Sequence, residues 1–383
     1  MDILIITLQP IETLTSAMFR TLAITRGLSE QGHNVDFLCI PDNQLQSKKR
    51  EQEFLKDINI IRTASNGAFL EARKIISGEK KTFKKFVVKF ARKLWHMFCV
   101  YDNTIRIANN VSISSLPKKE YDVIISSSDP KSSHIAAMNL INQGLKYKKW
   151  VQYWGDPLAL DISKENIYPR CILKYIEGKI IKNANKVVYV SPFTMEKQKN
   201  LLPKYADQMA FYPIAYMEEK IYPPTKNEVF TLGYYGNYDS MVRNIIPFYV
   251  ACKKFNEDIH VDIIGDSDLR LEATEHICIY PRGDILNFEA NADLIVCVLN
   301  SFGTQIPGKI YHAAGTNKKI LVIVDGDYTE QMKAYLNSFN RYFICDNNIE
   351  SIVEGIRIAK ESEATLMPLK ELNYQYISKA LIE

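Results

Sequence analysis

The chain has 383 residues, of which 46% are hydrophobic and 24% charged, and its formal net charge at pH 7 is +4. This composition is typical of a globular protein and excludes a disordered chain. Because the length exceeds what one ordinary hydrophobic core holds, two domains are expected.

The sequence predicts neither a membrane-spanning helix nor a set of disulfides or a zinc site. No window contains the ~18 uninterrupted apolar residues of a spanning helix, and the start MDILIITLQP has no basic stretch followed by a long apolar core. We therefore expect a cytosolic protein. The seven cysteines include no CxxC pair and no Cys/His cluster at ligand spacing, which predicts reduced core residues rather than disulfides or a zinc site.

The N-terminal half alternates strand-length apolar runs with helical periodicity. Residues 2–7 (DILIIT) predict a strand, 17–32 (AMFRTLAITRGLSEQG) a helix ending at Gly32, and 34–40 (NVDFLCI) a second, parallel strand. YDVIISSS, KWVQYW and KVVYVS predict three more buried strands in the same half.

A basic segment, residues 80–98 (KKTFKKFVVKFARKLWHMF), interrupts this half. Its apolar residues recur at i, i+3 and i+4, which predicts a helix with an apolar stripe flanked by seven Lys and Arg. Two interpretations stay open. The stripe packs on its own domain, or it lies on an anionic membrane surface, where each basic residue adds about 1 kcal/mol. Nucleic acid is disfavoured, because the aromatic residues follow one stripe and form no stacking platform.

The alternation restarts after a proline-rich stretch at 213–226. FTLGYYG, HVDIIGD, ICIYPRG, ADLIVCVL and KILVIVDG predict strands, and IPFYVACKKF predicts a helix. Two successive β/α domains with a joint near 213–226 are the simplest account of the pattern.

Several cofactor motifs are missing or weak. A nicotinamide-binding enzyme needs GxGxxG after its first strand, but the loop here, LQPIETLTSAM, has no glycine before Gly27. GxxxxGK[ST] is absent, which argues against a P-loop phosphotransferase. Asp325 and Asp327 superficially resemble a metal-binding pair, but such sequences also end strands as turns. The six histidines show no HxxxH or HxH spacing.

Four segments carry a resemblance to a known family. They are FRTLAITRGLSEQGHNVDFL, EGKIIKNANKVVYVSPFTMEKQ, LGYYGNY and IPGKIYHAAGTNKKILVI. In this order they resemble motifs of the retaining family 4 of GT-B glycosyltransferases, which build bacterial surface polysaccharides. The last segment looks like the donor signature PxKxxEYxAxGKPxL. The similarity covers most of the chain but is loose over residues 40–115.

The resemblance implies an α/β protein of the GT-B fold, with two Rossmann-like β/α/β domains facing each other across a cleft. Residues 1–213 would bind the acceptor and residues 214–367 the nucleotide-sugar donor. The C-terminal helix, 368–383, would return to the first domain through Leu369, Leu372, Tyr376 and Ile377. Deleting 369–383 would then loosen the two domains and leave both cores folded.

The implied activity is transfer of a sugar from a UDP- or GDP-linked donor to a lipid-linked saccharide, with retention and without a metal. The enzyme would work in the cytoplasm, at the inner face of the membrane that residues 80–98 contact. Two alternatives stay open: a GT-B nucleotide-sugar epimerase, and a catalytically inactive GT-B protein that serves as a partner subunit.

Donor chemistry requires a cation in the second domain. Cleavage of the anomeric C–O bond leaves negative charge on the diphosphate, and without a metal a fixed cation with backbone N–H groups must stabilise it. Lys309 at a helix start is our first catalytic candidate; the alternative is a solvated surface lysine. The further donor-binding candidates are Gly236, Asn237, Asp266, Arg282, Thr304, Pro307, Gly308, Ile310 and His312.

The chain also departs from the family signature. His312 stands where the family has a glutamate that contacts the nucleotide ribose, although a neutral imidazole can still accept or donate a hydrogen bond. Asn317 and Lys319 replace the glycine and proline of GKP, and the upstream glutamate has no counterpart in NSFGTQ. The identity of the nucleotide therefore stays open.

Acceptor candidates come from loops after N-terminal strands, because open α/β sheets bind ligands there. QPIETLTS, SSSDPKSSH and YWGDPLALD are those loops. Thr13, Trp154 and Asp156 are expected to bind the acceptor, and Asp156 or His134 to orient its hydroxyl or accept its proton. The alternatives are a turn for Asp156, a core position for Trp154 and a capping role for His134.

Overall fold

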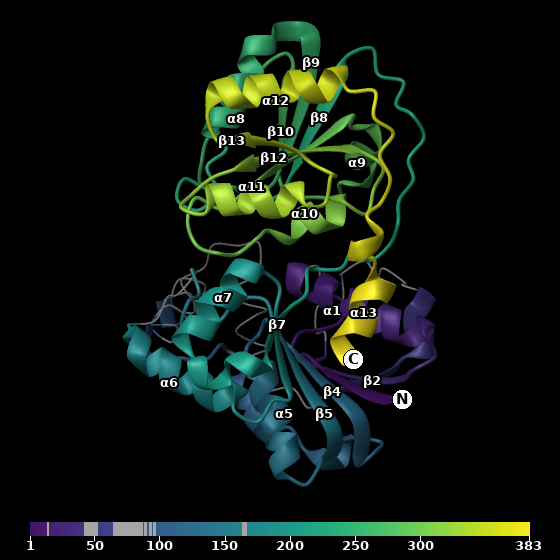
Figure 1. Ribbon diagram of the computed structural model, residues 1–383, viewed down its shortest axis with the longest axis vertical. Helices are drawn as coiled ribbons and strands as arrows, with labels where there is room; N and C mark the ends of the chain where they lie inside the picture. Colours follow the sequence, from purple (N-terminus) through teal and green to yellow (C-terminus); the bar gives the residue numbers. More distant parts are fainter. Residues whose placement is uncertain are drawn as a thin grey trace. The chain divides into compact units, whose positions relative to one another are not determined.

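The computed structural model describes residues 1–13, 15–41, 53–63, 87, 90–91, 94, 97–162 and 167–383. It consists of two compact units (Figure 1). The first contains Met1–Pro213 and Tyr374–Glu383, and the second contains Ile214–Asn373. Leu369 and Leu372, expected in the returning helix, belong to the second unit, because the Leu369 amide donates to Ala314 O and the Tyr216 amide donates to Leu372 O.

The first unit contains a parallel sheet with seven strands among the described residues, in the order β3-β2-β1-β4-β5-β6-β7. The strands are β1 Asp2–Ile6, β2 Asn34–Cys39, β3 Asn59–Arg62, β4 Glu120–Ser127, β5 Lys146–Trp154, β6 Lys186–Tyr189 and β7 Met209–Phe211. The predicted strands of this half are all present. The short strands β3 and β7 extend the sheet beyond them.

Helices accompany these strands, and all but the C-terminal α13 lie between them in the sequence. They are α1 Ser16–Glu30, α4 Ile105–Asn110, α5 Ser132–Asn142, α6 Arg170–Ile181, α7 Pro192–Leu201 and α13 Tyr374–Ile382, with 3-10 turns η1 Glu53–Asp57, η2 Ile113–Ser115 and η3 Pro203–Gln208. Thr15 caps α1, since its side chain accepts from the Met18 amide. Gly32, at φ +79°, lets the chain turn into β2.

The second unit contains a parallel sheet with six strands among the described residues, in the order β10-β9-β8-β11-β12-β13. Its strands are β8 Phe230–Tyr235, β9 Ile259–Ile264, β10 Ile277–Tyr280, β11 Leu294–Val298, β12 Lys319–Val324 and β13 Phe343–Asp346. Its helices are α8 Ile246–Cys252, α9 Leu286–Asn291, α10 Gly308–Ala313, α11 Thr329–Asn337 and α12 Ile349–Glu361, with η4 Lys253–Asp258 and η5 Lys370–Leu372. Strand β13 was not expected from the sequence.

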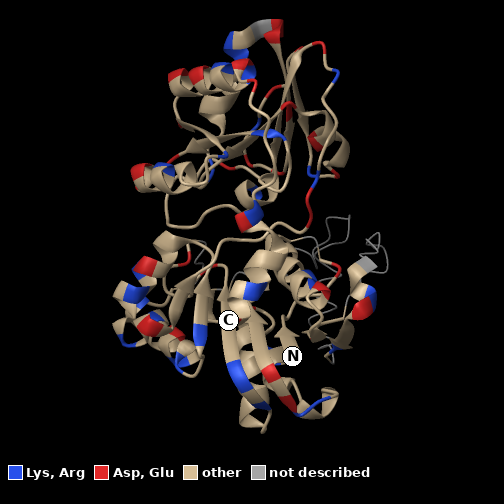
Figure 2. Ribbon diagram, turned by 45° about the vertical axis from the view of Figure 1, so that its right-hand side comes forward, with Lys and Arg blue, Asp and Glu red and all other residues tan. Residues whose placement is uncertain are grey.

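Burial follows the alternation of the sequence. The strands of both sheets are largely buried and mostly uncharged, whereas charged residues gather on helices and loops (Figure 2). The seven cysteines are free thiols. Four of them are buried as expected, but Cys99 and Cys278 are half-buried and Cys171 is exposed.

The C-terminal helix α13 packs on α1, in the first unit. A Cβ atom on Gly27 of α1 would overlap Ser378 Oγ, so the two helices approach closely at that glycine. Ile377 and Leu381 are buried in this contact. Tyr376, expected on the contacting side, is instead 61% exposed.

The basic segment 80–98 is described only in part. Lys80, Lys81, Lys84, Lys85 and the phenylalanines 83 and 86 lie outside the described residues. Val87, Phe90, Leu94 and Phe98 are helical and exposed. Within the described part of the chain, no helix has the length and apolar character needed to cross a membrane.

Candidate functional site

The strand order of each sheet reverses at one point, where loops from two neighbouring strands diverge and open α/β sheets bind ligands. In the second unit this point lies between β8 and β11. Gly236 is the first residue after β8, and Lys309 lies at the start of α10, which follows β11. The topology therefore brings these two predicted donor-binding residues to the same edge of the sheet.

The ammonium group of Lys309 lies directly over Gly236. A Cβ atom on Gly236 would overlap Lys309 Nζ, and the φ of Gly236, +148°, is one that other residues rarely adopt. Lys309 Nζ also lies 5.8 Å from the centre of the Tyr234 ring. Much of the lysine side chain is exposed, but its ammonium group is enclosed. Desolvation, and next the positive charge of Arg243, lowers the pKa of Lys309 to about 8.

Two arginines lie near this ammonium group. Arg243 donates from Nη1 to Asn237 O at 3.1 Å and from Nη2 to Asn300 Oδ1 at 2.8 Å. The positive charges of Arg243 and Arg282 both lower the pKa of Lys309. Among the described residues no carboxylate forms an ion pair with Lys309 or Arg243. Two neighbouring cations such as Lys309 and Arg243, with no carboxylate partner among the described residues, form a site for an anion.

Asn237 and Asp266 support the loops of this site. Asn237 Oδ1 accepts from the Asp266 amide at 3.2 Å, and Asp266 O accepts from the Tyr238 amide at 3.2 Å. This contact joins the loops after β8 and β9, so the Asn237 side chain has a structural role at this edge of the sheet. Asp266 itself is exposed.

The segment before Lys309 leads into the six-residue helix α10. Thr304 and Ile310 are buried, and Pro307 and Gly308 are half-buried. The Thr304 amide donates to Gln305 Oε1 at 3.1 Å. A helix this short contributes little dipole, so the charged side chains carry the attraction for an anion.

His312 lies beside a carboxylate that the sequence did not reveal. The pKa of His312 is lowered to about 4, mainly by burial and next by the positive charge of Lys220. The negative charge of the nearby Glu289 acts in the opposite direction. The imidazole is therefore neutral at pH 7. Glu289 Oε1 accepts from Lys220 Nζ at 2.9 Å and from the Tyr222 hydroxyl at 2.5 Å. A glutamate from α9 thus stands near the position that the family signature fills with its own glutamate.

The first unit reverses its strand order between β1 and β4. Near this point Lys131 Nζ binds Asp129 Oδ1 at 3.1 Å and Asp161 Oδ2 at 2.8 Å. Burial disfavours the Lys131 ammonium, but the charges of Asp129 and Asp161 outweigh it and raise the pKa of Lys131. Lys131 therefore stays charged and holds two loops together.

Asp156 follows β5 and completes this acidic cluster. Burial and the negative charge of Asp129 raise the pKa of Asp156 to about 7, against the pull of Lys131. Its residue surface is only half-buried, so solvent still reaches it. A partly accessible carboxylate that titrates near neutral pH is suited to accept a proton.

His134 and Trp154 lie in the core, contrary to their expected direct roles. Both are 0% exposed, and their rings stack with centroids 4.2 Å apart. His134 Nδ1 lies 2.8 Å from Ser126 Oγ, and Trp154 Nε1 donates to Gln152 Oε1 at 3.0 Å. Burial lowers the pKa of His134 well below its usual value. Since neither side chain reaches the surface, both pack in the core of the first unit.

Thr13 lies half-buried in the loop after β1, where its amide donates to Pro10 O at 3.0 Å. Gln9 in the same loop donates to Asp129 O at 2.5 Å, which joins this loop to the one after β4. Arg20, which the sequence did not single out, is buried, donates to Ser128 O and lies 5.1 Å from the Tyr153 ring centre.

The residues missed by the sequence analysis are mainly cations and their partners. Lys131, Asp129 and Asp161 lay in or beside quoted loops, but no local pattern distinguished them from solvated charges. Arg243 and Glu289 lie far from Lys309 and His312 in the sequence. Only strand pairing and the reversal of the sheet order bring them together.

Comparisons with known proteins agree on the fold. No protein-family model matches the sequence, and no curated protein matches it either. Solved structures do match over the whole chain, and three of them illustrate the similarity. TarM has 10% identity and a TM-score of 0.56, with 100% of this chain and 95% of that chain covered.

The other two are a protein from Anabaena and one from Rickettsia. Alr3699/HepE from Anabaena, in complex with UDP-glucose, has 11% identity and a TM-score of 0.55, over 100% of this chain and 96% of that chain. A glycosyltransferase from Rickettsia africae has 15% identity and a TM-score of 0.52, with 100% of this chain and 92% of that chain covered. Membership of the retaining family 4 stays a prediction. The two parallel Rossmann-like sheets and the match along the whole chain show that the chain has the GT-B fold.

Proposed function

We propose that this protein is a glycosyltransferase whose second unit binds a nucleotide-diphosphate sugar. The observation that carries the proposal is the pair of cations Lys309 and Arg243 at the strand-order reversal of the second sheet, with Arg282, from the loop after β10, near enough for its charge to lower the pKa of Lys309. With a pKa of about 8, Lys309 is still mostly charged at pH 7, although desolvation and the neighbouring positive charges disfavour its ammonium form. No carboxylate among the described residues lies within ion-pair range of it. A diphosphate supplies the negative charge that this arrangement lacks.

In the reaction, the anomeric C–O bond to the diphosphate breaks and negative charge grows on the leaving oxygen. The Lys309 ammonium and the Arg243 guanidinium stabilise this charge, and one such contact contributes about 3 kcal/mol to the transition state. Because Gly236 has no side chain, the diphosphate can approach the backbone after β8. The proposal requires no metal at this site.

Asp156 is the proposed base in the first unit. Its pKa of about 7 lets it accept the proton of an acceptor hydroxyl and release it to water. The acceptor is proposed to be a saccharide, and transfer is proposed to retain the anomeric configuration. Retention rests on the motif resemblance, since no nucleophile for a double displacement is identified among the candidate residues.

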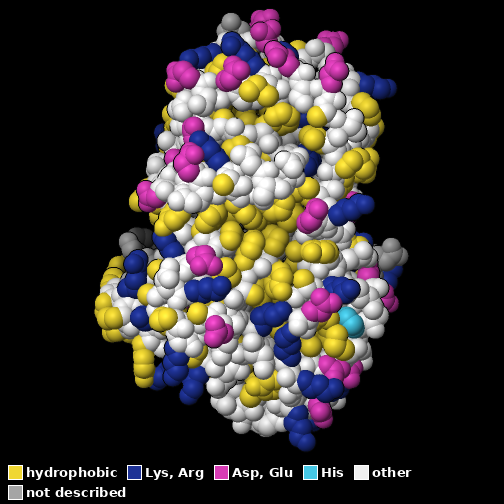
Figure 3. Space-filling model, in the orientation of Figure 1, with side chains coloured by type: hydrophobic (Ala, Val, Ile, Leu, Met, Phe, Trp, Pro, Cys, Tyr) yellow, Lys and Arg dark blue, Asp and Glu magenta, His cyan; other side chains and the backbone are white. Residues whose placement is uncertain are grey.

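We further propose that the acceptor is lipid-linked and that the protein works in surface polysaccharide synthesis, at the cytoplasmic face of the membrane. Phe90 and Phe98 are 56% and 57% exposed, and Ile172 and Tyr175 on α6 are 40% and 64% exposed. In Figure 3, apolar side chains on the left of the first unit lie among Lys and Arg side chains. Exposed apolar residues with nearby basic ones suit an anionic bilayer surface.

Helix α6 adds positive charge to this surface. Its exposed basic residues are Arg170, Lys174 and Lys179, and its only acidic residue, Glu177, is buried. Each basic residue near an anionic membrane contributes about 1 kcal/mol. This charge pattern supports a membrane surface as the partner of α6 and segment 80–98.

Calorimetric titration with UDP, GDP and their sugars tests the donor site and identifies the nucleotide. Lys309→Ala should weaken diphosphate binding and lower transfer at least about a hundredfold, because one transition-state charge contact is lost. Near-wild-type binding and transfer by a folded Lys309→Ala protein would overturn the donor assignment.

Product analysis separates the alternative activities. Transfer that depends on an added saccharide acceptor supports the transferase, whereas acceptor-free conversion to an epimeric sugar shows an epimerase. Binding of nucleotide sugar with no turnover under either condition shows an inactive partner protein.

A further inference from the structure

A second cluster of chemically active side chains lies elsewhere in the second unit. His260 and Asp262 alternate on strand β9, so both point to the same face of the sheet. Cys278 on β10 pairs directly with Asp262 in the parallel register. Side chains from two strands, 16 to 18 positions apart in the sequence, therefore meet on one sheet face.

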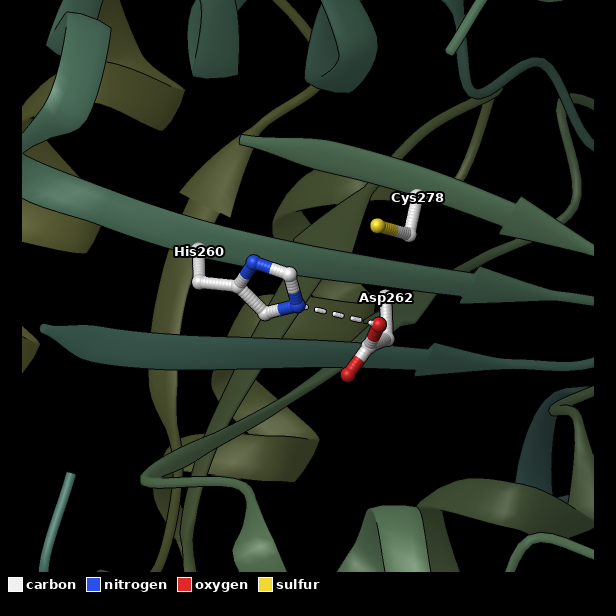
Figure 4. Close-up of side chains that lie close together, drawn as sticks. All are labelled: His260, Asp262 and Cys278. Carbon is white, nitrogen blue, oxygen red and sulfur yellow. Dashed lines mark hydrogen bonds and ion pairs between the residues drawn. The ribbon is translucent and has the colours of Figure 1, made fainter. Parts of the chain in front are cut away.

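The three side chains converge closely. His260 Nε2 lies 3.1 Å from Asp262 Oδ1, and one ligand atom from each of the three residues lies within 4.8 Å of the others. Figure 4 shows the Cys278 sulfur on the same side of the strands as the imidazole and the carboxylate. His260 is 37% exposed at its side chain and Cys278 is half-buried, so an ion can enter from solvent.

A buried hydroxyl without a partner adjoins the cluster. Gly233 on β8 pairs with Asp262, and a Cβ atom on Gly233 would overlap the Tyr235 hydroxyl, which therefore lies over that glycine, next to Asp262. Tyr235 is 7% exposed, and its hydroxyl has no hydrogen-bond partner among the described residues. Asp262 is 7% exposed and has His260 as its one hydrogen-bonding partner in the described part of the chain. The buried Asp262 carboxylate and the buried Tyr235 hydroxyl can thus each form a further hydrogen bond, or a bond to an ion, beside the cluster.

We propose that His260, Asp262 and Cys278 bind one Zn²⁺ ion. The donor set is an imidazole nitrogen, a carboxylate oxygen and a thiolate sulfur, which is a set that Zn²⁺ accepts and that Mg²⁺ and Ca²⁺ do not favour. A water molecule is the fourth ligand, and the Tyr235 hydroxyl is placed to bond this water or the carboxylate. Binding releases the Cys278 thiol proton to solvent, since the thiolate is the ligand.

The ion would hold an edge strand in place. Strand β10 has four residues and lies at the end of the sheet, where β9 is its one partner strand among the described residues. It leads directly to Arg282, which belongs to the proposed donor site. Coordination across β9 and β10 would therefore stabilise the second unit and fix the start of that loop. The site is independent of the proposed transfer, because binding and stability can be measured without turnover.

The test uses the full chain, freed of metal by a chelator and then titrated with Zn²⁺ and with Co²⁺. We expect one equivalent to bind, a thiolate-to-cobalt charge-transfer band to appear with Co²⁺, and thermal unfolding to move to higher temperature with Zn²⁺. Cys278→Ser and His260→Asn should each weaken Zn²⁺ binding at least about tenfold, because each removes one of three protein ligands. Cys278→Ser should also abolish the charge-transfer band.

Two matched variants control for other thiols and imidazoles. Cys171→Ser removes the exposed cysteine, and His276→Asn removes a histidine adjacent to β10 that is not in the cluster. Both should bind Zn²⁺ like the wild type. The proposal is overturned if the wild type takes up no Zn²⁺ in excess of that bound by folded Cys278→Ser, or if the Cys171→Ser variant loses the charge-transfer band instead.

Discussion

The ammonium group of Lys309 occupies the space that a side chain on residue 236 would fill. Gly236 directly follows strand β8 and Lys309 lies in the first turn of helix α10, so two residues more than seventy positions apart in the sequence are in contact. The glycine is therefore required by the lysine as well as by its own φ of +148°. This relationship places the cation at the edge of the sheet and suggests the first experiment.

Gly236→Ala should weaken nucleotide-diphosphate binding about as strongly as Lys309→Ala does. The added methyl group must displace the ammonium from its position over the backbone, which removes the same charge contact. Titration calorimetry with the preferred nucleotide measures the effect. Gly144→Ala is the matched control, because Gly144 also has a positive φ, +99°, but has open space around its Cβ position. Equal losses of affinity in both variants would show a general folding defect instead.

Diphosphate binding near pH 8 should be coupled to proton uptake. In the free protein Lys309 has a pKa of about 8, so about half of its side chains are neutral at that pH. A bound anion favours the ammonium and raises this pKa, so the complex takes up part of a proton. Calorimetry in buffers of different ionisation enthalpy measures the uptake. Lys309→Arg should remove it, because the guanidinium does not titrate in this range.

The rate of transfer should rise with pH towards neutrality. Asp156 must be ionised to act as a base, and its pKa is about 7, so kcat/KM for the acceptor should increase through pH 7 and then level off. Asp156→Asn should remove this rise and lower the rate about 10²–10⁴-fold. An unchanged pH profile in the variant would exclude Asp156 as the base.

Ionisation of Asp156, which should raise the rate, should lower the stability of the folded protein. Its folded pKa lies above the usual value of 3.8, so between pH 4 and 7 the folded state binds more protons than the unfolded state. The contribution of Asp156 to the free energy of unfolding therefore falls as pH rises through this window. Asp156→Asn should be more stable than the wild type at pH 8, as measured by urea unfolding.

Removal of helix α13 should destabilise the first unit, contrary to the expectation that both cores survive the deletion. Ile377 and Leu381 of α13 are buried and α13 packs on α1, so loss of the helix exposes apolar surface. Leu381→Ala alone should cost about 2–5 kcal/mol of the free energy of unfolding. Tyr376→Ala, on the same helix but 61% exposed, should change it little. Chemical denaturation of both variants compares the buried and the exposed position.

Membrane binding is tested by replacing four lysines, Lys80, Lys81, Lys84 and Lys85, with glutamine. Sedimentation with anionic liposomes and transfer to a lipid-linked acceptor should both fall, whereas transfer to a short soluble acceptor should change little. Salt should weaken the binding, because charges are screened within about 8 Å at physiological ionic strength. Glutamine at Lys226, Lys253, Lys254 and Lys370 of the second unit is the matched control. Undiminished sedimentation of the first variant would favour packing of the segment on its own domain and a soluble acceptor.

The amino-acid sequence alone determined the parts of this protein that follow from local periodicity. Apolar runs bounded by turns located the long central strands, and the order of strands and helices led to two parallel sheets. Lys309 and Gly236 could be proposed as donor-binding candidates because a lysine at a helix start and a glycine after a strand are local features. The edge strands β3, β7 and β13 were missed, since three or four residues carry too little alternation to predict a strand.

Tertiary structure decided which side chains meet. The reversal of strand order brought Arg243 to Lys309, and the pairing of β9 with β10 placed Cys278 beside Asp262. Burial also places the side chains of His134, in α5, and Trp154, at the end of β5, in the core, although the sequence had made both acceptor-site candidates. Such contacts depend on strand register and on side-chain desolvation, which arise only when distant segments pack, and no local pattern records them.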